Sequence, residues 1–138
     1  MKLFISLLLL GLSLSACATG PFANLNDVNR PNFVGQFLGK WHGQDNSSGS
    51  LDVKFTEGSN GTWSAISVFT YDGTDVNAKT KSVKIDGNKV ELIITWEVQG
   101  VIASTKLIGV LTNNQIEGTY VSTTSEEPAT GKWVITRK

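Results

Sequence analysis

Apolar and polar side chains alternate along most of the chain beyond residue 36, and turn residues separate the alternating stretches. The clearest stretch is 89–98, where every second residue from Val90 to Val98 is apolar and most residues between them are polar. Because successive side chains of a strand point to opposite faces, this period of two predicts a strand with one apolar face. The same reasoning predicts eight strands, at 37–44, 50–57, 62–71, 76–85, 89–98, 101–111, 115–122 and 131–137.

Short motifs of glycine, asparagine and aspartate connect the predicted strands, because these residues accept the positive φ of tight hairpins. Nearly every link is too short to cross between two sheets, which favours a meander over a two-sheet sandwich. A meander of eight strands must close to remove its edges. We therefore predict an all-β domain over 36–138, a single eight-stranded antiparallel up-and-down barrel. The turn motifs are Asn60-Gly61, Asp72-Gly73, Asp86-Gly87-Asn88, Gln99-Gly100 and Asn113-Asn114.

The first residues follow a different pattern, in which Met1 and Lys2 precede a mostly apolar run over 3–14. At about 1.5 Å per residue this run is about 18 Å long, shorter than a bilayer core of about 30 Å. It therefore predicts a secretory signal peptide. Leu14-Ser15-Ala16-Cys17 resembles the lipobox of bacterial lipoproteins, in which cleavage precedes a cysteine that receives a diacylglycerol. The alternative is a plain signal peptide, cut after an Ala-x-Ala-like site, that leaves a free thiol.

The lipobox resemblance implies a membrane anchor and a location. It predicts a signal peptide over 1–16 and lipidation of Cys17, which is the only cysteine. Several acyl chains, palmitate among them, would hold the protein stably at a membrane. Residue 18 is Ala rather than Asp, which by resemblance to the sorting rule of enteric bacteria favours the outer membrane of the bacterial cell envelope. Residues 17–35 are predicted to be a lipidated tether that ends in a short helical turn.

Composition narrows the classes of partner. The 138 residues suffice for one domain of ordinary size, and 12 Lys and Arg balance 12 Asp and Glu. This balance leaves no basic field to attract nucleic acid. A single Cys and a single His leave no thiol or imidazole zinc site. We expect no cofactor, no metal and no nucleic-acid partner, and the sequence identifies no protein partner.

A family resemblance starts at the first predicted strand. Asn32-Phe33 followed by Phe37-Leu38-Gly39-Lys40-Trp41 is similar to the opening motif of lipocalins, which is Asn-Phe, a short helical turn and Gly-x-Trp. The resemblance implies that Gly39 and Trp41 lie at a closed end of the barrel. It also implies that Arg137, near the end of the last strand, covers the indole ring of Trp41. A guanidinium over an indole contributes about 0.5–2 kcal/mol.

Other features depart from the lipocalin pattern. Thr112-Asn113-Asn114 stands where lipocalins have Thr-Asp-Tyr, and no helix is predicted after the last strand. Gly118-Thr119-Tyr120 together with Gly131-Lys132-Trp133 is similar to strands of avidins, but no set of biotin ligands can be matched. The chain thus resembles the wider calycin group, which includes avidins and fatty-acid-binding proteins, as a lipocalin-like barrel.

Catalytic motifs are weak. His42 has Asp45 nearby and serines are plentiful, yet no Gly-x-Ser-x-Gly turn is present, and a lone His beside a loop is usually a polar surface residue. Glu126-Glu127 lies in a loop rich in Thr, Ser and Pro, and adjacent carboxylates do not converge on one substrate atom as glycosidase acids must. We expect a solvated loop there and no enzyme activity.

The third predicted strand carries the candidate ligand site. Trp63, Ala65, Ser67, Phe69 and Tyr71 share one face, and the small residues between the rings leave room for a ligand if that face points inward. We expect this cavity at the end of the barrel away from the first-strand tryptophan. The predicted function is a lipid-anchored envelope protein that binds a small apolar or amphipathic molecule, such as a fatty acid. The alternative is an interaction protein with a packed barrel, such as an envelope protease inhibitor; a cavity above about 300 Å³ favours the first.

Overall fold

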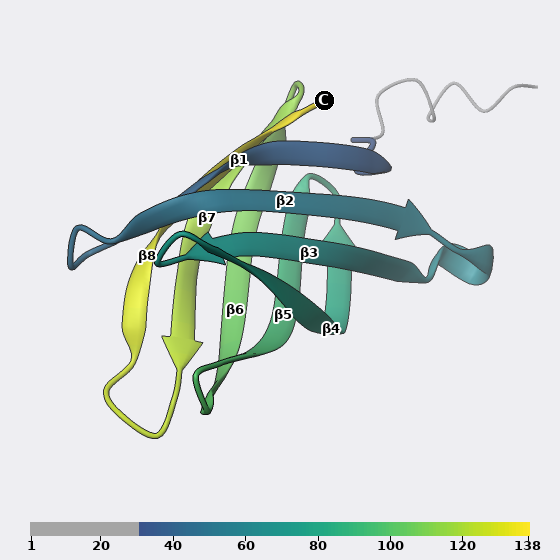
Figure 1. Cartoon of the computed structure of the whole chain (residues 1–138). Coiled ribbons are helices and arrows are strands. Elements are labelled where there is room, and N and C mark those ends of the chain that lie inside the picture. Colours follow the sequence, from purple (N-terminus) through teal and green to yellow (C-terminus); the bar gives the residue numbers. More distant parts are fainter. Residues whose placement is uncertain (1–30) are drawn as a thin grey trace, which may run out of the picture.

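Eight antiparallel strands follow one another around a closed barrel in the structure, a computed structural model that describes residues 31–138 (Figure 1). Each strand pairs with its neighbours in sequence, and the first closes the ring against the last. This confirms the predicted all-β, up-and-down barrel. The strands are β1 (Gly35–Gly43), β2 (Ser48–Glu57), β3 (Trp63–Tyr71), β4 (Thr74–Asp86), β5 (Lys89–Val98), β6 (Val101–Thr112), β7 (Gln115–Thr123) and β8 (Ala129–Arg137).

The predicted signal peptide over 1–16, the lipidation site Cys17 and the tether up to residue 30 lie outside the described residues. The short helical turn predicted at the end of the tether is absent from the described part, because residues 31–34 have no regular structure and β1 already begins at Gly35.

The predicted turn motifs form the ends of the hairpins. Both residues of Asp72-Gly73 and of Gln99-Gly100 have positive φ, between 49° and 79°. Asn60-Gly61 belongs to a single turn of 3-10 helix, η2 (Ser59–Gly61), between β2 and β3. Because two-residue turns of this hand join only adjacent antiparallel strands, local sequence alone sets much of the meander.

One face of every strand points into the barrel, and the interior residues are mostly aliphatic. Along β5 the side chains of Val90, Leu92 and Ile94 are at most 2% exposed, which confirms the alternation read from the sequence. The strands on either side supply Leu107, Leu111 and others from β6 and Val76 from β4. This core occupies the middle of the barrel, and the two ends are built differently.

The end where β1 begins is filled by four aromatic rings. Phe33 and Phe37 each meet the ring of Phe55 edge to face, with 6.0 Å between centroids. Trp63, the first residue of β3, packs edge to face against Phe33 at 6.4 Å. Edge-to-face pairs of this kind contribute beyond the area that they bury. This end of the barrel is therefore closed.

Arg137 covers the closed end, but over a different ring from the predicted one. Its guanidinium lies 4.5 Å from the ring centre of Phe37 and donates hydrogen bonds to the backbone carbonyls of Asn32 and Val34. Gly35 has a φ of +123° and passes under the guanidinium, where a Cβ atom would lie 3.0 Å from Nη1. The Gly-x-aromatic unit at the closed end is therefore Gly35 to Phe37.

The prediction that Gly39 and Trp41 form the closed end is wrong. Trp41 lies four residues beyond Phe37 on β1, about 13 Å farther along the strand, and is half-buried at the opposite end of the barrel. The physical reason is that β1 begins at Gly35, two residues after Phe33, without an intervening helical turn. The ring that lies under the Arg137 guanidinium is therefore Phe37, which precedes Trp41 in the strand. Gly39 is needed for another reason: a Cβ there would lie 2.0 Å from the carbonyl oxygen of Val134 on β8.

The Trp133 side chain is buried in the core and is 1% exposed. Its indole N–H donates to the carbonyls of Ile108 and Thr119, at 3.2 and 3.1 Å. Its ring edge lies over Gly109 on β6, where a Cβ atom would come within 2.6 Å of Cζ2. Trp133 of β8 thus reaches across β7 to β6 and ties three strands together.

Candidate ligand-binding cavity

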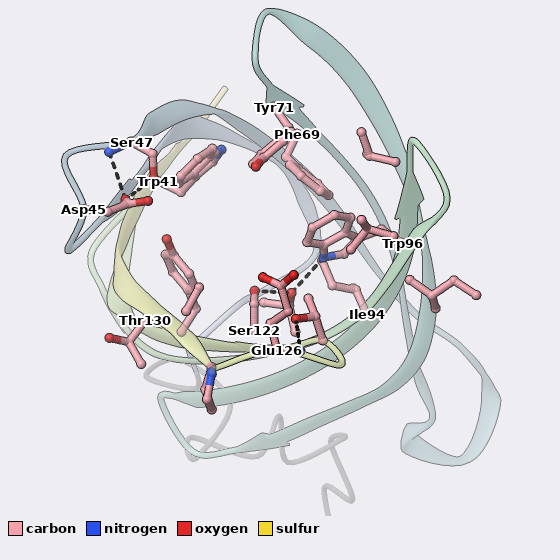
Figure 2. A pocket seen from close by; sticks show the side chains of 18 of the residues that line it. Trp41, Asp45, Ser47, Phe69, Tyr71, Ile94, Trp96, Ser122, Glu126 and Thr130 are labelled. Carbon is pink, nitrogen blue, oxygen red and sulfur yellow. Dashed lines mark hydrogen bonds between the residues drawn. The ribbon is translucent and has the colours of Figure 1, made fainter.

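The end of the barrel opposite Phe33 and Phe37 is hollow. A cavity of about 860 Å³ opens to solvent there, between the β1–β2 loop, the β5–β6 turn and the β7–β8 loop. Figure 2 views this cavity from close by, with its lining side chains arranged around a ring of strands. Sites for small molecules have volumes of about 300–1,000 Å³. The volume of this cavity is therefore sufficient for one small ligand.

Four aromatic rings form an arc around the mouth of the cavity, and we call Tyr120, Trp41, Tyr71 and Trp96 the aromatic arc. Successive ring centroids along the arc are 6.2, 6.5 and 6.0 Å apart. The planes of Trp41 and Tyr71 are nearly parallel, at 14°. The four side chains come from β7, β1, β3 and β5. The arc therefore exists only once the barrel has closed.

The deeper wall of the cavity is apolar. Leu51, Phe69, Ile94 and Leu107 line it, and each is at most 7% exposed. The Phe69 ring packs edge to face against Trp96, with 5.4 Å between centroids. These side chains offer a ligand only apolar surface, which suits a hydrocarbon or aromatic body.

Two buried hydroxyls interrupt the apolar wall. Thr105 Oγ1 accepts a hydrogen bond of 2.8 Å from the indole N–H of Trp96 and lies 2.6 Å from Ser122 Oγ. Both residues line the cavity and are less than 9% exposed. The pair has two hydroxyl protons, and the bond between the two oxygens uses one of them. Among the hydrogen bonds within residues 31–138, none uses the other proton, which leaves one donor for a molecule in the cavity.

Three carboxylates lie on the rim: Asp45 on the β1–β2 loop, and Glu126 and Glu127 on the β7–β8 loop. The Asp45 carboxylate accepts hydrogen bonds from the hydroxyl and the backbone N–H of Ser47, and these bonds lower the pKa of Asp45 below its usual value. Burial raises the pKa of the Tyr120 phenol, and the negative charge of Asp45 raises it further. Near neutral pH the mouth therefore carries an anionic Asp45 beside a neutral Tyr120.

The predicted ligand site on β3 is only partly at this cavity. Phe69 and Tyr71 line it, whereas Ala65 and Ser67 are buried below it and Trp63 belongs to the closed end. The inward orientation of this face is as expected, but the cavity lies at the end of the barrel that contains Trp41, not the end away from it. Ser67 Oγ is buried with no hydrogen-bond partner in the described part of the chain.

His42 is not part of the cavity, whereas the carboxylates of Asp45, Glu126 and Glu127 lie at its rim. His42 is exposed on β1 and pairs with Ser48 and Lys132 in register, outside the cavity lining. Within residues 31–138, no three side chains of His, Cys, Asp and Glu come together in a group that could hold a metal ion.

Sequence reasoning missed most of the cavity, including Tyr120, the hydroxyl pair and the role of the rim carboxylates. A signal for the pair was present: Thr105 and Ser122 are polar residues at positions that the two-residue period assigns to the apolar face. A polar side chain on a buried face marks either an internal hydrogen bond or a lined cavity. The rim carried no such signal, because loop carboxylates are normally solvated.

The fold and the cavity define a small, closed, eight-stranded β-barrel that is filled at one end and hollow at the other. Comparison with protein-family models, with curated proteins and with solved structures found no match. The part of the chain that the structure describes contains no helix with the length and apolar character needed to cross a membrane.

Proposed function

We propose that this protein is a lipid-anchored binding protein of the bacterial envelope that holds one small amphipathic molecule in the open end of its barrel. The observation that carries the proposal is the cavity of about 860 Å³, with its apolar wall, aromatic arc and buried hydroxyl pair. A fully packed interior, as an interaction protein with a structural core would have, leaves no such volume. The barrel would remove the apolar body of the ligand from water, and the hydroxyl pair would bind an acceptor on it.

The envelope location is part of the same proposal and rests on the sequence alone. The apolar run over 3–14 followed by Leu14-Ser15-Ala16-Cys17 supports lipidation at Cys17, and Ala at position 18 supports the outer membrane. The described barrel begins at Gly35, so the anchored cysteine and the first strand are separated by 17 residues, 18 to 34. A tether of this length lets the barrel stand away from the membrane surface.

Filling the cavity should abolish binding. In Ser122→Phe the added ring extends from a buried position on the wall into the open volume, and we expect affinity for the neutral apolar dye N-phenylnaphthylamine to fall at least about tenfold. The matched control is Thr123→Phe, which places the same ring on the exposed outer face of β7. Dye fluorescence on titration gives the affinity, and thermal unfolding confirms that both variants are folded.

A second pair of variants keeps the test decisive if Ser122→Phe does not fold. Val98→Trp adds volume at a half-buried lining position near the mouth, with Glu97→Trp as its exposed counterpart. Equal dye binding by all four variants and the unchanged protein would contradict the proposed cavity function. If the unchanged protein binds neither this dye nor a panel of lipids, the interaction-protein alternative becomes the better account.

Cys17→Ser should remove the anchor. Because only the thiol can receive the diacylglycerol, we expect the variant to lose incorporation of labelled palmitate and to leave the membrane fraction or retain its signal peptide. Mass spectrometry of the mature chain and membrane fractionation measure both effects. Unchanged membrane retention with the same mature mass would show that Cys17 is not lipidated, without bearing on the cavity.

A further inference from the structure

The charges around the mouth of the cavity are of one sign. Asp45, Glu126 and Glu127 line it, whereas among residues 31–138 no Lys, Arg or His does. The whole chain has 12 basic and 12 acidic residues, so this bias is a property of the mouth and not of the overall composition. Figure 2 shows the Glu126 carboxylate projecting inward from its loop, on the side of the opening where Ser122 lies and across from Trp41.

Both indole N–H groups at the mouth are already engaged in hydrogen bonds within the protein. The indole N–H of Trp41 donates to the Thr70 carbonyl at 3.0 Å, and that of Trp96 donates to Thr105. A carboxylate head group would therefore meet three like charges and neither indole N–H. The fatty acid suggested by the sequence fits this mouth poorly, because no cation in the lining would offset its charge.

A cationic head group, in contrast, would be attracted by the groups at the mouth. Ring faces carry negative electrostatic potential, and tryptophan and tyrosine attract ammonium groups most strongly when the site is partly shielded from water. Two indoles and two phenols form the aromatic arc, and Asp45 lies beside its Tyr120 end, close enough to raise the pKa of that phenol. The arc and the carboxylates therefore attract the same charge.

The hydroxyl pair lies on the wall of the same cavity and offers a bound molecule one polar contact. Ser122 lines the cavity and is only 8% exposed. The Ser122–Thr105 pair has one hydroxyl proton for which the described residues provide no acceptor. In a cavity open to solvent a water molecule can accept this proton, so the pair is compatible with an ammonium ligand that has no acceptor of its own.

We propose that the cavity selects amphiphiles with a cationic ammonium head group, held at the mouth by the aromatic arc and the three rim carboxylates, with the apolar body against Leu51, Ile94 and Leu107. The inference rests on the proposed function, since it names the ligand class of the same cavity. It excludes fatty acids as the preferred class.

Three probes with one chain length test the selectivity: decyltrimethylammonium, decanol and decanoate, each below the concentration at which it forms micelles. Displacement of N-phenylnaphthylamine measures their affinities near neutral pH and low salt. We expect decyltrimethylammonium to bind at least about tenfold more tightly than decanoate, with decanol between them. Added salt should weaken the cation, strengthen decanoate relative to it and leave decanol nearly unchanged.

Variants separate the rim charges from the rings. The triple variant Asp45→Asn, Glu126→Gln, Glu127→Gln should lower affinity for decyltrimethylammonium about tenfold and leave decanol unchanged. Glu117→Gln, which neutralises an exposed carboxylate on the outer face of β7, is the control and should change neither. Trp41→Leu, which removes one ring face from the arc, should weaken the cation more than decanol.

The outcomes distinguish the two proposals. Decanoate binding as tightly as decyltrimethylammonium, or a triple variant with unchanged cation affinity, would overturn the cationic selectivity while the cavity function stands. Failure of the dye and of all three probes to bind would overturn the proposed function itself. Loss of cation binding in Ser122→Phe is expected as well, and cation binding that survives in it would place the cationic site outside the cavity.

Discussion

Replacing Phe37 with alanine should lower the free energy of unfolding by about 3–5 kcal/mol, the range for aromatic truncations in cores. Phe37 has no exposed surface, packs on Phe55 and lies under the Arg137 guanidinium. Its removal leaves a cavity at the closed end and takes away the ring beneath the cation. Equilibrium unfolding in urea measures the loss.

Trp41→Ala is the matched comparison for Phe37→Ala, because both side chains point inward from β1. Trp41 is larger but half-buried at the mouth, so its truncation should cost less stability than that of Phe37. The order of the two variants is the decisive result. A larger loss of unfolding free energy in Trp41→Ala than in Phe37→Ala would contradict this arrangement. It would favour Gly39 and Trp41, rather than Gly35 and Phe37, as the residues of the closed end.

Trp133→Ala should destabilise the protein at least as much as Phe37→Ala, again by about 3–5 kcal/mol. The variant removes a side chain that is 1% exposed and leaves the carbonyls of Ile108 and Thr119 without the indole donor that they share. The loss of these two hydrogen bonds adds to the cost of the cavity. A loss below about 1 kcal/mol in urea unfolding would show that the indole does not tie β8 to β6 and β7.

A double-mutant cycle tests the contact that positions Trp133. Gly109→Ala alone should destabilise by about 1–3 kcal/mol, because the new Cβ would lie 2.6 Å from the indole. In a Trp133→Phe background the smaller ring relieves the contacts with the indole and leaves the one with Ile116 Cγ2, at 2.9 Å, so the same change should cost less. Additive effects of the two substitutions would mean that the two residues are not in direct contact.

The strands and turns were predictable because they depend on neighbours in sequence. Alternation from Val90 to Val98 assigns one face of β5 to the interior, and Asp72-Gly73 and Gln99-Gly100 supply the positive φ that their hairpins need. Because the links are short, the order of the strands around the barrel follows their order along the chain. Closure follows from the need to cover two edges.

The sequence by itself thus determined an all-β chain, eight strands and an up-and-down barrel, together with the expectation of an N-terminal lipid anchor. It did not determine which aromatic residues close the barrel. Phe37 and Trp41 both point inward from β1, and a period of two treats them alike. Only the register of β1 against β8, which pairs Phe37 with Arg137 and Trp41 with Trp133, places one under the guanidinium and the other at the mouth.

The cavity was likewise decided by the tertiary structure. The aromatic arc takes its rings from four different strands, and the acidic rim comes from loops about 80 residues apart in the chain, at Asp45 and Glu126. Local sequence patterns predict which face of a strand each side chain occupies. They do not predict which residues of other strands lie opposite that side chain. The charge and shape of the mouth arise from barrel closure and register, because these alone bring the distant strands and loops to one end.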